Sequence, residues 1–281
     1  ANASGYVEAA SYKIEAQDLA TSGWDSTSSS SKITLSFWFR CSTNQAFRLN
    51  VRSEDGTARM FSTDFTATGN NTWTKITKTI PGNTSPTVDV DNDNGSGLAI
   101  FWIPFYGTDL TDSGSTMDAW KTYSGSSQGT DMASTWLTAG ASTFDITGVQ
   151  LEVGSVATDF EHRSFGQELY LCQRYFELLT FTNYQFTGYF QGGGNPSVPI
   201  FWNVQKRTTP TITTPTIGTG TDQLQVTNNA GSWDTGSTNL APSQVSTMFA
   251  RLTGSGYNSG GGTIASVYIN GSNSIQVSAE L

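Results

Sequence analysis

The single histidine, His162, is the residue on which any serine–histidine–acid hydrolase in this chain would depend. It lies between Glu161 and Arg163, immediately before a helix-capping pattern. Because geometry and not composition defines a catalytic triad, we favour a packing or hydrogen-bonding role for His162. The sequence contains no HExxH motif and no metal-type cluster of His and Cys, so zinc chemistry is not expected.

Three aspartates at alternating positions, Asp89, Asp91 and Asp93, form the most metal-like run of the sequence. Their hard carboxylate oxygens suit Ca²⁺. An EF-hand loop is excluded, because counting from Asp89 puts Asn94 and Ile100 where that loop requires Gly and Glu. A structural Ca²⁺ site and a solvated acidic turn both stay open, and the acidic turn is the commoner arrangement. No other cofactor is indicated.

Glycoside hydrolysis would need two carboxylates that face each other across a sugar, about 5 to 9.5 Å apart. Four aspartates of one irregular region could supply such a pair: Asp109, Asp112, Asp118 and Asp131. Nothing in their spacing defines a pair, and acidic side chains commonly solvate a loop. We therefore expect no enzymatic activity and keep a polysaccharide depolymerase as the weaker alternative.

Aromatic side chains support a binding function better. The flat apolar faces of sugars stack on Trp and Tyr, while Asn and Asp bond the hydroxyl groups. Residues of these types lie in polar loop regions of both halves of the chain: Trp120, Tyr123, Trp136, Trp233, Asp234, Tyr257 and Asn258. Local packing or a subunit interface is the competing role for each. Three further tryptophans, Trp38, Trp73 and Trp102, belong to strand-like runs and are predicted to lie in the core.

The composition predicts an all-β protein of about two domains. The chain has 281 residues, and only 13% of them are charged, about half of the usual ~25%. Its polar residues are mainly Ser, Thr, Asn and Gly, which suit strands and turns. A net charge of −9 without any basic cluster argues against nucleic acid as a partner. No apolar run approaches the ~18 residues of a membrane span, so membrane insertion is not expected.

Alternation of apolar and polar residues predicts strands in the first half at 33–40, 47–52, 73–80, 98–103 and 144–153. Between residues 106 and 141 the pattern fades into a long polar loop, a type that is usually functional or mobile. Beyond residue 181 we expect strands at 186–190, 198–204, 211–217, 224–227, 245–252, 264–269 and 275–279. Many short strands with turns between them favour a sandwich over a βαβ fold.

One helix is predicted after Ser164, which has capping-box spacing to Gln167. Apolar residues at steps of three and four then form one stripe: Phe165, Leu169, Cys172, Phe176 and Leu179. We expect this helix to connect two β domains. The chain is therefore divided into residues 1–160, a linking helix at 161–180 and a C-terminal β domain at 181–281. Cys41 and Cys172 are both predicted to be buried free thiols.

The stretch ITGVQLEVGSVATDFEHRSFGQELYLCQRYF, residues 146–176, resembles a junction shared by tail-fibre and other virion structural proteins of marine and other tailed phages. Three upstream runs are similar to the jelly-roll, carbohydrate-binding-module-like domain of that family: ITLSFWFR, NNTWTKITKTIPG and DNDNGSGLAI. Downstream, KRTTPTIT resembles the start of a small C-terminal β domain. The resemblance covers residues 14–213, and the rest of the chain is similar only in style.

This resemblance implies a jelly-roll β-sandwich, a short linking helix and a second, smaller β-sandwich domain. It also implies a homotrimer on the virion, in contact with other virion proteins and with a host-surface glycan. Two alternatives stay open: a head fibre or capsid decoration protein without a receptor role, and a depolymerase. The family usually carries another strand before the position of Ile14. Here only residues 1–13 precede it, so either the chain is processed or truncated, or a neighbouring subunit supplies the missing strand. The first sheet edge is therefore expected to be open to pairing with another chain.

Overall fold

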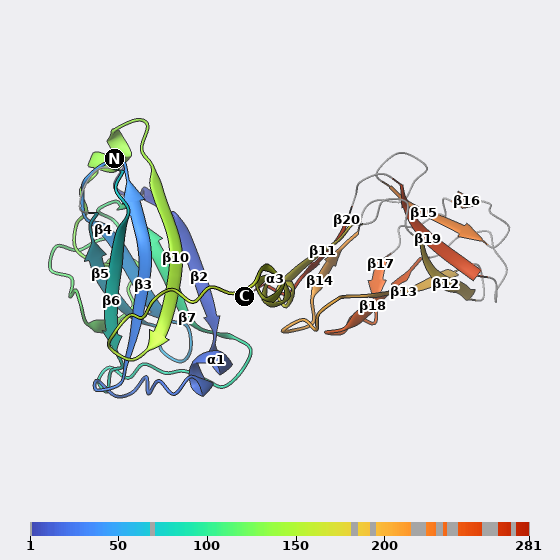
Figure 1. Cartoon of the computed structure of the whole chain (residues 1–281), viewed down its shortest axis with the longest axis horizontal. Coiled ribbons are helices and arrows are strands. Elements are labelled where there is room, and N and C mark those ends of the chain that lie inside the picture. The colour runs from blue at the N-terminus through green and yellow to red at the C-terminus, as the bar shows by residue number, and fades with distance from the viewer. Residues whose placement is uncertain are drawn as a thin grey trace. The chain divides into compact units, whose positions relative to one another are not determined.

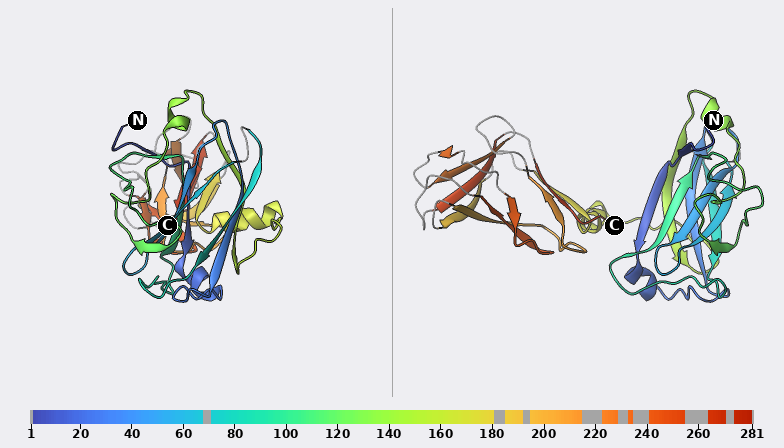
Figure 2. Two further views of the ribbon diagram at one scale, coloured as in Figure 1. Left: turned by 90° about the vertical axis from the view of Figure 1, so that its left-hand side faces the viewer. Right: turned by 180° about the vertical axis from the view of Figure 1, so that it is seen from behind.

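The protein is described from a computed structural model that covers residues 2–67, 71–180, 185–191, 195–214, 223–228, 233–234, 241–254, 264–270 and 274–280. It divides into two compact units, residues 1–162 and 163–280, each with its own hydrophobic core. Strands make up most of the regular structure of both units (Figures 1 and 2). The chain is therefore all-β, as its composition predicts.

The first unit contains two main antiparallel sheets (Figure 1). One has the order β10–β3–β6, formed by Phe144–Val153, Lys32–Cys41 and Thr74–Pro81. The other has the order β2–β7–β4–β5–β9, formed by Ala10–Glu15, Ser96–Ile103, Phe47–Ser53, Arg59–Phe65 and Trp120–Thr122. A short separate pair joins β1 (Tyr6–Val7) to β8 (Phe105–Tyr106).

Side-chain alternation places the apolar residues of both sheets in one core, which is the arrangement of a β-sandwich. Leu35, Phe37 and Phe39 of β3 are fully buried. They belong to the same cluster as apolar residues of β4, β5 and β7. Phe37 packs edge to face on Phe65 at 5.2 Å and on Trp102 at 5.8 Å between ring centres, a favourable geometry for aromatic rings.

The five strands predicted in the first half are confirmed as β3, β4, β6, β7 and β10. Strands β2, β5 and β9 of the five-stranded sheet and the short helix α1 (Ala16–Thr21) were not predicted. The alternation of β5 is masked because Met60 is apolar at an outward position and Thr63 is polar at an inward one. Strand β2, which contains Ile14, lies at a sheet edge as expected.

Two of the three tryptophans that were predicted to lie in the core are exposed. Trp102 is buried as predicted, whereas Trp38 and Trp73 are 41% and 40% exposed. Trp38 alternates with the buried Phe37 and Phe39, so its side chain points to the opposite face of β3.

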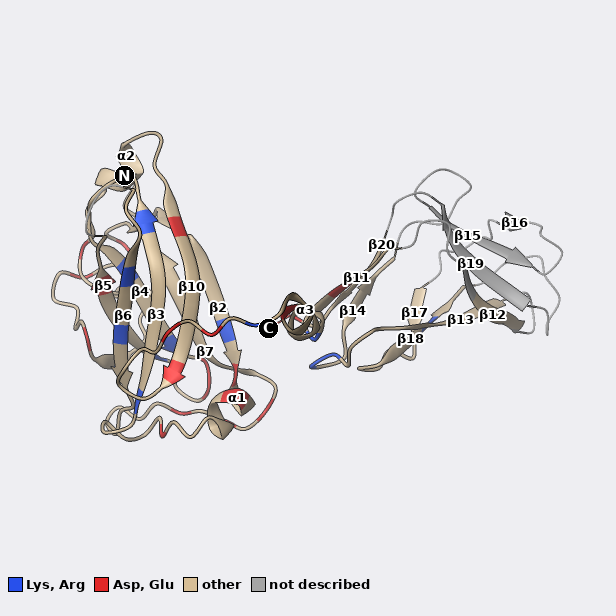
Figure 3. Cartoon of the chain, in the orientation of Figure 1, with Lys and Arg blue, Asp and Glu red and all other residues tan. Residues whose placement is uncertain are grey.

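On the part of the first unit seen in Figure 3, charges of both signs are interspersed, and Arg40 of β3 pairs with Asp145 of β10 at 2.9 Å.

The second unit also contains two antiparallel sheets. A three-stranded sheet has the order β11–β20–β14, formed by Phe176–Thr180, Ser274–Ser278 and Thr211–Thr213. A seven-stranded sheet has the order β16–β15–β19–β12–β13–β18–β17, formed by Trp233–Asp234, Gln223–Asn228, Ile264–Asn270, Gln185–Gln191, Asn195–Phe201, Phe249–Thr253 and Ala241–Ser243. Residues of both sheets share one core, among them Leu179, Val277, Val198 and Leu252.

Helix α3 (Phe165–Gln173) begins at the predicted capping box. The Ser164 hydroxyl accepts a bond from the Gln167 amide, and the Gln167 side chain accepts one from the Ser164 amide. The helix is shorter than predicted, because Phe176 and Leu179 belong to strand β11. No residue of α3 is buried. Cys172 is therefore exposed, contrary to the prediction, whereas Cys41 is buried.

Among the described residues, no helix is long and apolar enough to cross a membrane.

Candidate functional site

The outer face of the five-stranded sheet of the first unit is unusually polar. Phe47, Leu49 and Val51 of β4 point into the core, so the intervening Arg48, Asn50 and Arg52 point to the opposite face. Arg48 and Asn50 are nevertheless fully buried. A covering layer must therefore lie on this face, and the chain between β8 and α2 (Thr135–Thr138) supplies it.

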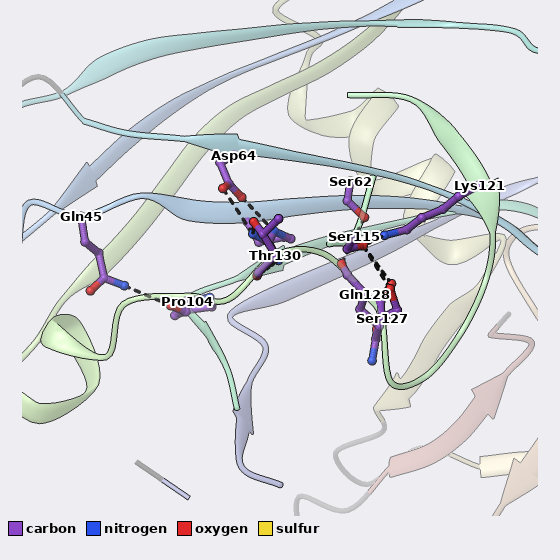
Figure 4. Close-up of polar contacts among 10 residues, drawn as sticks. Gln45, Ser62, Asp64, Pro104, Ser115, Lys121, Ser127, Gln128 and Thr130 are labelled. Atoms are coloured by element: carbon purple, nitrogen blue, oxygen red, sulfur yellow. Dashed lines mark hydrogen bonds and ion pairs between the residues drawn. The ribbon is translucent and has the colours of Figure 1, made fainter. Parts of the chain in front are cut away.

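The covering loop is held by the Arg48 guanidinium. Arg48 donates from Nε and Nη2 to the two carboxylate oxygens of Asp64, at 2.8 and 3.2 Å. Its Nη1 donates to the carbonyl oxygen of Thr130 at 2.7 Å (Figure 4). The loop backbone approaches so closely at Gly129, with φ +145°, that a Cβ there would lie 2.0 Å from Arg48 Nη1. Glycine is therefore required at this position.

A second set of contacts ties the loop to itself and to β5 (Figure 4). The Ser62 hydroxyl donates to the carbonyl oxygen of Gln128 at 3.1 Å. The Lys121 ammonium donates to the Ser115 hydroxyl, which also accepts a bond from Ser127 Oγ. Burial lowers the pKa of Lys121, and the nearby Arg48 charge lowers it further.

A lysine beside two serines could in principle activate a nucleophile. The run Gly125–Gly129 even has GxSxG spacing, which the sequence reasoning overlooked. In hydrolases this motif turns sharply from a strand into a helix, whereas here Ser127 lies in an irregular loop. Neither Ser115, Lys121 nor Ser127 lines the neighbouring pocket. We therefore assign these contacts to holding the loop.

One pocket of about 170 Å³ opens beside this loop. Its lining combines aromatic, charged and amide side chains from five separate segments: Tyr6, Glu8, Arg52, Phe101, Tyr106, Leu110 and Gln128. Aromatic rings with a few convergent polar groups are the usual lining of a site for small organic ligands. This pocket is the candidate functional site.

Arg52 is held as part of a stacked platform. Its guanidinium carbon lies 5.2 Å from the centre of the Phe101 ring and 5.0 Å from that of Tyr123. Its Nε donates to Glu54 at 2.6 Å. Cation–π contact and ion pairing thus restrict this side chain together.

Tyr106 forms the buried polar part of the pocket wall. Burial raises its pKa to about 12, and the nearby Glu8 carboxylate adds to the rise. The neighbouring Asn50 amide lowers the pKa. Within the described residues, however, neither polar atom of the Asn50 side chain makes a full hydrogen bond. At neutral pH the Tyr106 hydroxyl keeps its proton and can both donate and accept a hydrogen bond.

The aromatic residues predicted from the middle of the chain have three different environments. The prediction that Trp120 contacts a ligand from a polar loop is wrong. Trp120 lies in strand β9, is only 6% exposed and donates from Nε1 to the carbonyl oxygen of Pro81. Trp136 of α2 is half-buried against the core and donates to Thr143. Tyr123 does reach the candidate site, through Arg52. Thus only one of the three lies beside the pocket.

Of the four predicted site residues of the C-terminal half, two lie among the described residues. Trp233 and Asp234 form strand β16, which pairs with β15. Tyr257 and Asn258 lie outside the described residues. Their predicted contact with a glycan stays a prediction.

The proposed calcium ligands are not gathered into a metal site. Asp93 accepts a bond from the Gly95 amide, and the Asp91 amide donates to Asp55. Burial raises the pKa of Asp55, and the carboxylates of Asp91 and Asp93 add to the rise. Across the described ranges, no group of three or more His, Cys, Asp or Glu is placed to hold a metal ion, so Asp89, Asp91 and Asp93 remain an acidic turn.

The remaining candidates for chemistry have structural contacts. The ring of His162 packs edge to face on Phe160 at 5.0 Å. Asp112 accepts a bond from the Gly114 amide, and Asp131 accepts one from the Thr111 hydroxyl at 2.6 Å. Both carboxylates thus bond groups of the covering loop itself.

The chain is thus an all-β protein with a small pocket lined by aromatic and polar side chains. No family model, curated protein or solved structure matches the chain.

Proposed function

We propose that this chain is a non-enzymatic structural and attachment subunit of an external bacteriophage appendage, such as a tail fibre. In this proposal the first unit is a jelly-roll domain that contacts a host-surface glycan. The phage assignment rests on the resemblance of residues 146–176 and of the upstream runs. The glycan assignment rests on one observation, the pocket in which Tyr6, Phe101 and Tyr106 meet Arg52 and Gln128.

Sugars match this lining chemically. A pyranose ring presents C–H faces that pack on aromatic rings, and its hydroxyls bond to amide, phenol and guanidinium groups. The pocket is small, with a volume of about 170 Å³, so it does not enclose a long oligosaccharide. Contact with the end of a chain or with a single branch is therefore expected.

The lining favours binding over hydrolysis. Glycoside hydrolases need a pair of carboxylates across the scissile bond. Among the seven lining residues only Glu8 is acidic. The depolymerase alternative therefore gains no support at this site.

The second unit supports association with further copies of the chain. Helix α3 exposes Phe165, Leu169, Tyr170 and Leu171, and Phe201 packs on Phe249 while both remain exposed. Apolar groups in such number on one unit commonly mark a protein interface. This agrees with the homotrimer implied by the resemblance. It equally suits the alternative of a head fibre or decoration protein without a receptor role.

Glycan binding by the full-length chain tests the proposal. Tyr6→Ala removes an exposed ring of the pocket, and we expect roughly tenfold weaker binding on a glycan array. Tyr12→Ala is the matched control, since Tyr12 is similarly exposed, at 59% against 64%, but does not line the pocket. Binding that is absent throughout, or equally weakened by both variants, contradicts the glycan assignment. Antibody labelling of intact particles tests the virion location.

A further inference from the structure

We infer that this pocket selects neutral saccharides and rejects acidic ones, because its cations are already paired with carboxylates of the protein while Glu8 lines it unpaired. The inference rests on the proposed function and specifies its ligand class. Two arginines on one strand would ordinarily indicate a site for an anionic group, so their pairing within the protein decides the ligand class.

The charge of each arginine of β4 is balanced by a carboxylate of the protein. Arg48 is fully buried, and its guanidinium is engaged by Asp64 and Thr130. Arg52 lines the pocket, but its Nε bonds Glu54 at 2.6 Å. Its guanidinium also lies over the rings of Phe101 and Tyr123. A ligand carboxylate at Arg52 would therefore have to compete with Glu54 for a guanidinium whose charge is already balanced.

The other two cations on this face of the sheet do not reach the pocket. Lys121 of β9 donates to Ser115 and is absent from the lining. Lys13 of the edge strand β2 is also absent from the lining. The positive charge of this face is therefore either neutralised or directed elsewhere.

Glu8 makes the pocket locally negative. In the described part of the chain no cation lies within ion-pair distance of its carboxylate. Its charge raises the pKa of the Tyr106 hydroxyl more strongly than the Arg48 charge lowers it. A uronic or sialic acid would bring a second carboxylate into this field, whereas the hydroxyls of a neutral sugar can donate to Glu8. The net charge of −9 adds a longer-range repulsion of acidic polymers.

Matched sugar pairs test the inference on the full-length chain. We would titrate gluco-, manno- and galacto-oligosaccharides against the corresponding uronic acid oligomers, which differ at C6 by a carboxylate. We expect at least one neutral oligomer to bind about tenfold more tightly than its uronic counterpart. The ratio of the two dissociation constants, uronic over neutral, should fall roughly fivefold in Glu8→Gln at low salt.

Glu168→Gln is the control, because it makes the same change in net charge on α3 in the second unit. It should leave the ratio unchanged. A uronic oligomer that binds as tightly as its neutral partner, or a ratio that Glu8→Gln does not change, overturns the inference. If the oligomers that bind the wild-type chain bind Tyr6→Ala more weakly, the proposed glycan function stands even when the inference fails. Failure of all six probe series to bind overturns the proposed function itself.

Discussion

At the scale of single residues, Arg48 connects the fold to the candidate site. Its side chain is completely buried, yet it carries a permanent charge. Such a charge is tolerated only when it is paired and its donors are satisfied. Asp64 and Thr130 satisfy it here, and Thr130 brings the covering loop with it. The loop that forms one side of the pocket is thus held by a charge in the sheet.

Asp64→Asn tests this connection. The substitution keeps the shape of the side chain but leaves the Arg48 charge unpaired. We expect the first unit to lose about 3 kcal/mol, the lower end for a broken buried pair, because the Asp64 side chain is 37% exposed. The loss is measured by denaturant unfolding of the full chain.

Asp145→Asn is the control for Asp64→Asn. It breaks the Arg40–Asp145 pair, in which both side chains are 38% exposed. An exposed pair should contribute less than about 1 kcal/mol. If the two variants lose equal stability, water reaches Arg48 and the loop is held by other contacts.

At the scale of elements, the end of α3 depends on a residue distant in sequence. The Lys206 ammonium donates to the carbonyl oxygen of Gln173, the last residue of the helix, and to Glu177 of β11 at 2.7 Å. A cation at a helix C-terminus is favourable because the last carbonyl groups lack partners. Both Lys206 and Glu177 are buried. This pair links the helix to the sheet although no α3 side chain is buried.

Lys206→Met should destabilise the second unit by about 3 to 5 kcal/mol, since it leaves the Glu177 carboxylate buried and unpaired. The double variant Lys206→Met with Glu177→Leu should recover at least half of this loss, because apolar residues replace a buried ion pair at small cost. Denaturant unfolding of the single and the double variant measures the difference between their free energies of unfolding. A double variant that is less stable than the single one would mean that the bond from Asn203 to Glu177 dominates.

At the scale of the whole molecule, the chain has two cores without a shared residue. Each core draws on both sheets of its own unit, so each unit contains the contacts that define a domain. The boundary lies between His162 and Arg163, directly before the capping box that begins α3.

Two matched core truncations test whether the units fold independently. Phe37 and Phe190 are both fully buried, one in each core. Phe37→Ala should lower the stability of the first unit alone by about 3 to 5 kcal/mol, and Phe190→Ala that of the second alone. Hydrogen exchange of the full chain, followed by peptides of each unit, measures both. Loss of protection in both units by either variant would show that they unfold together.

The sequence alone determined the class of the protein, five strands of the first unit and the start of α3. These features depend on local chemistry: side chains alternate along a strand with period two, and a capping box spans four residues. Local chemistry also explains one error. Phe176 and Leu179 were assigned to the helix although they belong to strand β11, because a short apolar run fits a helix and a strand alike.

Only the tertiary structure decided what covers the sheet and where the pocket lies. Trp120 is buried because β9 joins the edge of the five-stranded sheet through β5. The pocket combines Tyr6, Arg52, Phe101 and Gln128, which lie far apart in the sequence. Strand pairing and loop packing over long separations bring them together, and no local pattern encodes those separations.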